Sequence, residues 1–330
     1  MKKASAQRRP VSRWRKLDRY WCYVFIAPAV VSYVLFTAWP MAASWYYSFF
    51  DWIGLGAPSE FVGLGNFIEA ARNPYFWQAF LHTFQYMIGL VALNLPLTLI
   101  MAVVLNNKRL KGAAFYRVLY FLPVVTTTAI IGIVMTYIFS PFNGALNIAL
   151  IKIGLLDKPV HWLGQAATAM LTVVVVAVWK GFGVNMLYWL AGLQSIPEEL
   201  YEAAKVDGAT GVQAFWFVTL PLLKPVGTVI TLLTITGALQ VFDLMKVMTN
   251  GGPFFATETV SLFIYRYAFG QQSRIGFASA AGIFFGVAAM IVAGLQSVLV
   301  QRANAERVGR QRVQPTAAIE PVAGRPPTGV

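Results

Sequence analysis

The sequence is poor in the residues that most catalytic and metal sites need. Its 330 residues include one cysteine and two histidines, and only 13 side chains carry a carboxylate. The lone Cys22 cannot form an internal disulfide, and so few Cys and His residues supply little material for a metal centre or a Cys/His catalytic pair. We therefore expect no catalytic residues, no metal and no cofactor in this chain.

A nucleotide-binding loop is missing as well. The phosphate-binding pattern Gly-x-x-x-x-Gly-Lys followed by Ser or Thr occurs nowhere in the sequence. If ATP drives a process in which the chain takes part, the nucleotide must therefore bind to another subunit.

Charged residues are scarce, and apolar residues take their place. They make up 12% and 58% of the chain, and the mean hydropathy of +0.61 lies outside the usual range of a soluble domain. About 20 mainly apolar residues span a membrane. Six stretches are long enough, with cores at residues 24–43, 83–105, 118–139, 170–190, 225–247 and 278–300. The sequence thus predicts an all-α integral membrane protein with six transmembrane helices, in a domain of residues 20–303.

The basic residues are distributed unevenly between the two predicted sides of the membrane. If the amino terminus is cytoplasmic, 19 of the 26 Lys and Arg residues lie on the cytoplasmic side, eight of them in the first 19 residues. This asymmetry places the basic segment 1–19, the loop after the fourth span and the tail 304–330 in the cytoplasm. The composition of the tail predicts disorder. The net charge of +13 then reflects topology and anionic lipid, and we expect no nucleic-acid partner.

The loop after the fourth span contains a predicted short helix. Ser195 and Glu198 match a capping box, Pro197 suits a first helical turn, and Gly208 can end the helix with a positive φ. This helix has two different faces. The charged face is formed by Glu198, Glu202 and Lys205, and the apolar face is formed by Leu200, Ala203 and Ala204. A helix this short cannot bury a face alone, so it needs its own membrane domain or another protein.

Three ionisable residues fall inside or at the end of predicted spans. Lys180 closes the charge-free part of the fourth span, and Asp243 and Lys246 lie late in the fifth. A bare charge there costs on the order of 3 kcal/mol, so each needs water or a partner. We interpret them as candidates for a hydrated solute path. The alternatives are a charge that snorkels to the membrane interface, a structural Asp243–Lys246 pair and, for Lys180, a position at a helix end.

Amide side chains within the spans are further candidates. Asn94, Asn185 and Gln240 could bind solute hydroxyl groups or make hydrogen bonds between helices. The second role is the favoured one for Asn94.

One spacing identifies a family. Glu202, Ala203 and Ala204 are followed after three residues by Gly208, and the pattern continues with Val218 and with Leu220-Pro221. This matches the EAA loop of ABC importer permeases. Further matches are FIAP at 25–28, FYRVLYFLP at 115–123 and TNGGP at 249–253. From about residue 20 to 300 the chain resembles the permease subunits of binding-protein-dependent ABC sugar importers, of the type found in the maltose and glycerol-3-phosphate systems.

The resemblance implies a mechanism. In this family of type I importers the EAA loop forms a cytoplasmic coupling helix that docks into a groove of an ATPase subunit and transmits its motion to the membrane helices. By position, that role falls to Glu202, Ala203, Ala204, Asp207, Gly208 and Pro221. The implied partners are a second permease subunit, two ATP-binding subunits, an external solute-binding protein and membrane lipid. The implied location of the chain is the cell inner membrane. The implied solute is a carbohydrate or a related compound.

Other functions stay open on the sequence alone. Within transport, the alternative is a glycerol-3-phosphate importer, because that permease type has the same motifs. Outside this class, the alternatives are a self-contained secondary carrier and a membrane scaffold without a solute path, for which the EAA spacing would be accidental.

Overall fold

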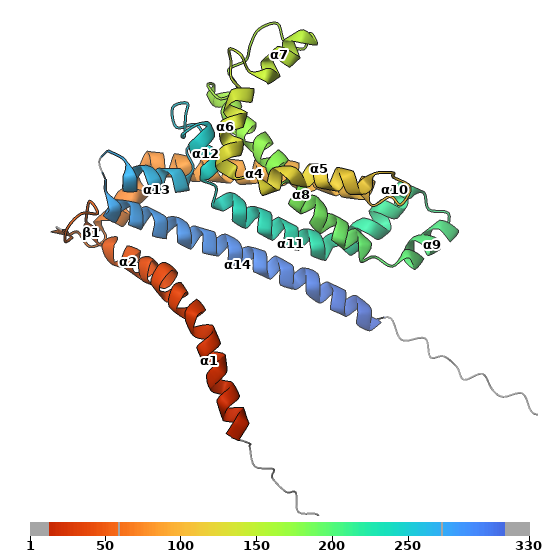
Figure 1. Ribbon diagram of the computed structural model, residues 1–330, viewed down its shortest axis with the longest axis horizontal. Coiled ribbons are helices and arrows are strands. Elements are labelled where there is room, and N and C mark those ends of the chain that lie inside the picture. Colours follow the sequence, from red (N-terminus) through yellow and green to blue (C-terminus); the bar gives the residue numbers. More distant parts are fainter. Residues whose placement is uncertain (1–12, 59, 272, 314–330) are drawn as a thin grey trace, which may run out of the picture. The chain divides into compact units, whose positions relative to one another are not determined.

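The computed structural model describes residues 13–58, 60–271 and 273–313, and these are predominantly helical (Figure 1). They fall into two compact units. The first holds the chain up to Asn73 together with Ile264–Phe284, and the second holds Pro74–Phe263 and the chain from Phe285 onward.

The first unit begins with the first predicted span. The helix α1 (Arg13–Tyr33) continues through a π-helical turn, η1 (Val34–Ala38), into α2 (Trp39–Tyr47). Residues 20–47 form a continuous stretch of 28 residues that contains an 18-residue window with a mean hydropathy of 1.8. The span predicted at 24–43 is therefore confirmed.

A small hairpin follows in the same unit. The strands β1 (Phe50–Asp51) and β2 (Glu60–Phe61) pair antiparallel, and α3 (Gly65–Arg72) comes next. The buried amide of Asn66 donates hydrogen bonds to the carbonyls of Ser48 and Phe50, both at 2.9 Å. Arg274 donates two hydrogen bonds to the carboxylate of Glu69, at 2.6 and 2.7 Å. These bonds hold the hairpin, α3 and the residues just before α14 (Ile275–Val313) together.

Three long helices form the core of the second unit: α4 (Pro74–Leu105), α8 (Ala166–Gln194) and α11 (Leu220–Leu239) (Figure 1). The helices α4 and α8 run parallel. Gly89 lies against Val174, where an added Cβ would come within 3.3 Å of the valine side chain, and Asn94 further along α4 donates to the carbonyl of Val178. Because the two neighbours are parallel, the chain must cross the membrane once more between them.

That return crossing is bent. The helices α5 (Ala113–Val125) and α6 (Thr128–Ile138) meet at an angle of 99°, so the prediction of one continuous span at 118–139 is wrong in this respect. Pro123 has no N–H to donate, and Thr126 and Thr127 adopt extended backbone angles that interrupt the helix. The parallel arrangement of α4 and α8 makes the bent pair one crossing. With the five continuous candidates among the described residues, this gives six.

The fifth span ends earlier than predicted. It runs from α10 (Gly211–Ala214) through a second π-helical turn, η2 (Phe215–Thr219), into α11 and stops at Leu239. The prediction that it extends to residue 247 is wrong, because Gln240 and Phe242 leave helical geometry and α12 (Asp243–Met248) starts as a separate helix. The hydroxyl of Thr259 donates to the carbonyl of Val241 in the break, at 3.2 Å.

The remaining helices are α7 (Ala145–Lys152), α9 (Glu198–Val206), α13 (Val260–Phe269) and α14. The sixth predicted span, 278–300, falls within the apolar stretch Ile275–Val298 of α14 and is confirmed. The helix continues to Val313, past the predicted start of the tail at residue 304. Residues 1–12 and 314–330 lie outside the described chain, so the properties of the two terminal segments stay predictions.

Candidate coupling site and solute pathway

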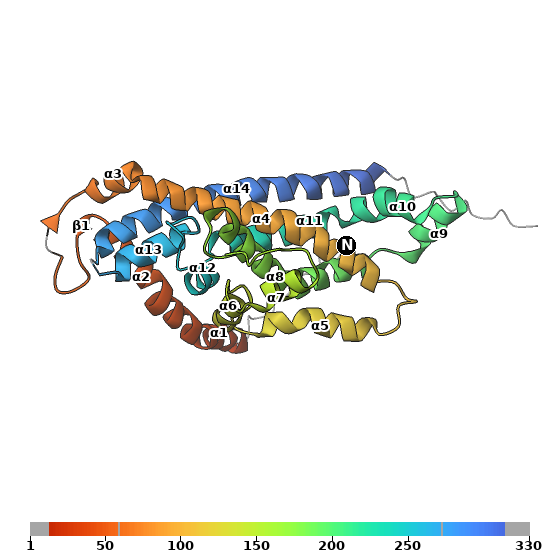
Figure 2. The ribbon, with the colours of Figure 1, turned by 90° about the horizontal axis from the view of Figure 1, so that it is seen from above.

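The helix α9 lies between two membrane spans, beyond the ends of α8 and α11 and at the same end of its unit as the α4–α5 loop (Figures 1 and 2). Glu198 and Glu199 occupy its first turn and Lys205 its last, an order that suits the helix dipole. The prediction that Ser195 and Glu198 form a capping box is wrong. Because α8 continues to Gln194, Ser195 caps its carboxyl end and donates to the carbonyl of Gly192 at 2.7 Å. Pro197 is the N-cap of α9, without a side-chain bond.

The carboxyl end of α9 is a Schellman turn, in agreement with the helix end predicted at Gly208. The N–H of Gly208 donates to the carbonyl of Lys205, the N–H of Ala209 donates to that of Ala204, and Gly208 has a φ of +79°. A Cβ added at Gly208 would meet none of the described residues within 4 Å. The position therefore requires glycine for its backbone conformation and not for space.

None of the residues of α9 is fully buried. Tyr201 and Ala204 are half-buried, while Glu199, Glu202, Ala203 and Val206 form an exposed stripe at helical spacing, with Val206 87% exposed. The apolar face expected from Leu200, Ala203 and Ala204 is thus divided, because Ala204 turns toward its own chain. We call the four exposed residues the outer stripe of α9.

Two polar contacts attach α9 to other helices of its unit. The hydroxyl groups of Tyr201 and Thr219 lie 3.0 Å apart, which joins α9 to η2 at the foot of α11. Lys108, from the α4–α5 loop, donates to both carboxylate oxygens of Glu198, at 2.9 and 2.7 Å. The charged face predicted for α9 is therefore partly engaged within the chain, and Glu202 is left on the outer stripe.

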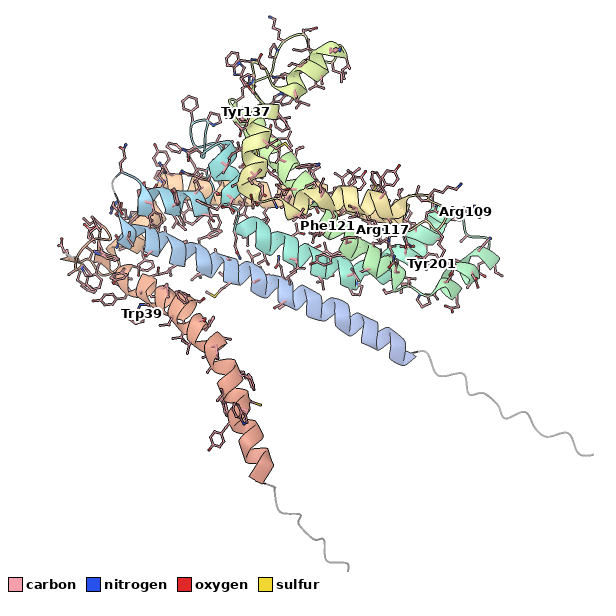
Figure 3. The ribbon with its side chains drawn as sticks, viewed as in Figure 1. Trp39, Arg109, Arg117, Phe121, Tyr137 and Tyr201 are labelled. Carbon is pink, nitrogen blue, oxygen red and sulfur yellow. The ribbon has the colours of Figure 1, made fainter. Side chains whose placement is uncertain are left out.

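Tyr201 lines two clefts. One has a volume of about 640 Å³ and is also lined by Lys108, Arg117 and Glu198. The other, of about 270 Å³, is also lined by Gly211 and Thr219. Figure 3 shows Arg117 and Tyr201 toward the same end of this unit. Because Tyr201 lines both clefts, α9 is loosely packed against the bundle at this point.

The other residues assigned to the coupling loop lie around α9. Asp207 is its exposed C-cap, next to Gly208. Pro221 is set apart, half-buried in the first turn of α11. It follows η2, whose π-helical bond runs from the N–H of Leu220 to the carbonyl of Phe215. Because Pro221 has no N–H to donate, it is compatible with the altered hydrogen-bond ladder at this point.

A polar layer crosses the core of the second unit. Asn185 of α8 donates to the side-chain oxygen of Asn94 on α4 at 2.5 Å and to the hydroxyl of Thr234 on α11 at 3.1 Å. Asn94 is 1% exposed, whereas Asn185 is half-buried. The three long helices are therefore joined by side-chain hydrogen bonds at this level.

Lys180 lies in the interior of α8, with 14 residues of the helix on either side of it. The alternative that it marks a helix end is wrong. The side chain is half-buried, and no hydrogen bond or ion pair joins it to any of the described residues. Since an unpaired cation at this depth is costly, it requires water or a bound group beside it.

The other three pathway candidates lie beyond the fifth span. Gln240 is the exposed C-cap of α11, and Asp243 and Lys246 occupy the first and last turns of α12. Lys246 also donates to the side-chain oxygen of Asn250 at 2.8 Å. The prediction that Asp243 and Lys246 lie inside a span is wrong, and their order along α12 suits the dipole of that short helix.

Three residues of the site were not predicted from the sequence: Tyr201, Thr219 and Lys108. A bulky aromatic residue three positions before Ala204 was an available signal that this side of α9 packs inward. The partners of Tyr201 and Glu198, 18 and 90 positions away, gave no signal in the sequence.

Six apolar crossings joined by short helices define a multi-pass membrane protein, and comparison with known proteins specifies the class. Residues 94–308 match the family of binding-protein-dependent transport system inner membrane components. The chain is 37% identical over 259 residues to the probable ABC transporter permease protein YurN of Bacillus subtilis, covering 78% of this chain and 88% of that protein. It is 34% identical over 259 residues to the lactose transport system permease protein LacF of Rhizobium radiobacter, covering 78% and 86%.

A solved structure has the same fold. It belongs to a bacterial ABC transporter involved in the import of the acidic polysaccharide alginate, with a TM-score of 0.76, 25% identity, and coverage of 88% of this chain and 98% of that one. The chain therefore belongs to the family of binding-protein-dependent transport system inner membrane components, the permease subunits of ABC importers. It is a transport subunit of the inner membrane, and this membership decides against the self-contained carrier and the scaffold.

Proposed function

We propose that this permease subunit serves an ATP-driven importer of a carbohydrate or a related solute, and that α9 couples it to an ATPase subunit. The observation that carries the proposal is the outer stripe of α9. Two carboxylates, Glu199 and Glu202, stand beside Ala203 and Val206 on a helix that the described part of the chain leaves uncovered. This surface suits a groove with basic side chains at its rim and apolar ones at its floor.

The proposed complex contains a second permease subunit, two ATP-binding subunits and an external solute-binding protein. ATP hydrolysis takes place on the ATP-binding subunits, since the sequence has no phosphate-binding loop. The family is binding-protein-dependent by description, which supports the external protein.

The proposed orientation places α9 and both chain termini in the cytoplasm. The Lys108–Glu198 pair supports it, because it brings the basic α4–α5 loop, with Lys108, Arg109 and Lys111, to the same end as α9. Basic loops are retained on the cytoplasmic side. The break between α11 and α12 then lies toward the outer side.

The proposed solute path includes Lys180 and Asn185. Both are half-buried in the interior of α8, and Lys180 has no protein partner among the described residues. Gln240, Asp243 and Lys246, which lie past the outer end of α11, serve in this proposal at the outer mouth of the path. A path lined with amide and ammonium groups provides hydrogen bonds to solute hydroxyl groups.

The experiment that tests the function is reconstitution. The chain is placed in liposomes with the second permease, the ATPase and the binding protein expressed from neighbouring genes, and uptake of radiolabelled sugars and of sn-glycerol-3-phosphate is followed. We expect uptake of at least one carbohydrate that requires ATP and the binding protein together. Uptake that proceeds without ATP or without the ATPase subunits would refute the proposal.

A further inference from the structure

The attachment of α9 to its own membrane helices is unusually sparse for a helix that has to transmit force. It buries none of its residues, and clefts of about 640 and 270 Å³ are lined by its residues Glu198 and Tyr201 together with residues of the bundle. A helix that packs over a broad apolar face is held by that face. This one is held at its ends by the chain and along its length by two polar contacts.

The first contact is at Tyr201. Its hydroxyl lies 3.0 Å from that of Thr219, whose side chain is only 4% exposed. Thr219 closes η2, the π-helical turn in which the fifth span starts. Tyr201 lines both clefts, and its ring carries the hydroxyl to η2, so this hydrogen bond links α9 to the start of α11.

The second contact is the ion pair of Lys108 and Glu198. It links the first turn of α9 to the loop that joins α4 and α5, and Asn107 stabilises that loop by accepting a hydrogen bond from the N–H of Arg109 at 2.9 Å. Both side chains are well exposed, 81% and 68%, so salt screens their attraction. The Tyr201–Thr219 bond is shielded by comparison.

We propose that Tyr201 is the positioning residue that transmits the motion of α9 to the fifth span, and that Lys108 and Glu198 form a second, salt-sensitive tie to α4 and α5. This inference rests on the proposed function of α9 as the coupling helix. It assigns a role to residues outside the outer stripe: they do not contact the ATPase subunit but determine how much solute moves for each ATP hydrolysed. Since only the short link of residues 195–197 joins α9 to α8, the two ties make α4, α8 and α11 respond together.

The test compares solute uptake per ATP hydrolysed in proteoliposomes that contain the complete transporter. Tyr201→Phe removes one hydroxyl and keeps the ring. We expect this ratio to fall about fivefold, the factor that one such hydrogen bond contributes to an equilibrium, while the affinity for the ATPase subunit stays unchanged. Tyr188→Phe is the matched control, because Tyr188 lies exposed on α8 and no hydrogen bond to its hydroxyl is formed among the described residues.

Thr219→Val should lower the ratio to the same extent, and the double variant should be no worse than either single one, because both remove the same bond. Lys108→Glu should lower the ratio at low salt, the exchange Lys108→Glu with Glu198→Lys should restore it, and high salt should abolish the difference. A Tyr201→Phe ratio equal to that of Tyr188→Phe, or additive effects of Tyr201→Phe and Thr219→Val, would overturn the inference. Wild-type transporter without ATP-dependent uptake would instead refute the proposed function itself.

Discussion

Two short helices of this permease, α9 and α12, carry the same charge order but are held in opposite ways. Each follows a membrane span and has acidic charge in its first turn and a lysine in its last turn. In α12, three of six residues are buried, Leu244, Met245 and Met248, whereas α9 has none among nine. The chain thus covers α12 with its own side chains and leaves α9 uncovered.

The difference shows that charge pattern and packing are separate properties of such helices. A charged helix between two spans is an ordinary structural connection when its apolar side is buried, as in α12. When the apolar residues remain exposed, as Val206 does on α9, the surface suits a second protein. The following predictions test whether the two helices really differ in this way.

The largest effect is expected for a buried residue of α12. Met245 is 0% exposed, so Met245→Ala should destabilise the purified permease by about 2–5 kcal/mol. Val206→Ala on α9 should change stability by less than about 0.5 kcal/mol, because Val206 has little to lose on its own chain. Denaturation of both variants in the same detergent, followed by tryptophan fluorescence, measures the difference. Equal destabilisation would mean that α9 is packed like α12.

The next effect concerns the turn that ends α9. Gly208→Val forces a β-branched residue into a positive φ, at a cost on the order of 1–3 kcal/mol, and should weaken binding of the ATPase subunit about tenfold. Gly211→Val is the matched control, since an added Cβ at Gly211 also meets open space but the backbone there has no positive φ. The affinity of the ATPase subunit for permease in nanodiscs provides the measurement. If both valine variants bind alike, the turn is not what positions α9.

A moderate effect is expected for charge reversal on the two helices. Glu202→Lys, on the outer stripe of α9, should reduce the affinity for the ATPase subunit about fivefold and slow its association, because like charges then face each other. Asp243→Lys is an equivalent reversal at the exposed start of α12 and should leave that affinity unchanged. Association rates at two salt concentrations distinguish the two variants. A loss of affinity with Asp243→Lys alone would invert the assignment.

The smallest effect is expected for the ion pair of Glu69 and Arg274, which stabilises the fold and has no part in the proposed coupling. The hydrogen bonds from Arg274 lower the pKa of Glu69 below its ordinary value of 4.5. The pair therefore contributes its full stabilisation to the first unit when the pH is above the ordinary pKa of Glu69. This contribution is lost as the pH falls through the lowered pKa of Glu69 in the folded protein. Arg274→Gln should weaken this unit by less than about 1 kcal/mol at pH 7 and by less still at pH 2, where the ion pair is already lost and only the contact of the guanidinium with the Phe277 ring, 4.9 Å from its centroid, is removed.

Hydrogen exchange of residues 50–72 in wild type and in Arg274→Gln, at both pH values, measures that contribution. Coupling should be unaffected, in contrast to Lys108→Glu. A difference between the two proteins that is as large at pH 2 as at pH 7 would contradict the contribution of the ion pair.

Much of the fold could be predicted from hydropathy, because membrane spans differ from all other segments in composition. The spans at 24–43 and 278–300 are confirmed on that ground. The bend at Thr126 and the break after Leu239 were missed, since a run of apolar residues looks the same whether its helix is straight or broken. Pro123 indicated a kink near the first of these, but nothing in the composition indicated its size.

The candidate site was predicted in part. Gly208 has the positive φ that its place at a helix end indicated, and the EAA spacing identified the family. The capping box was assigned to Ser195 and Glu198, whereas the structure forms one at Thr210 and Gln213. Both pairs fit the same short pattern, but α8 extends to Gln194 and takes Ser195 as its C-cap.

The most direct test of the central claim labels the outer stripe of α9. In a chain with Cys22→Ser, a single cysteine replaces Val206, and its reaction with a maleimide is followed in nanodiscs with and without the ATPase subunit. A cysteine in place of Phe142, which is 82% exposed between α6 and α7, is the control. We predict that the ATPase subunit protects the cysteine at 206 and not the one at 142. Equal labelling at 206 with the ATPase subunit bound and absent would contradict the account.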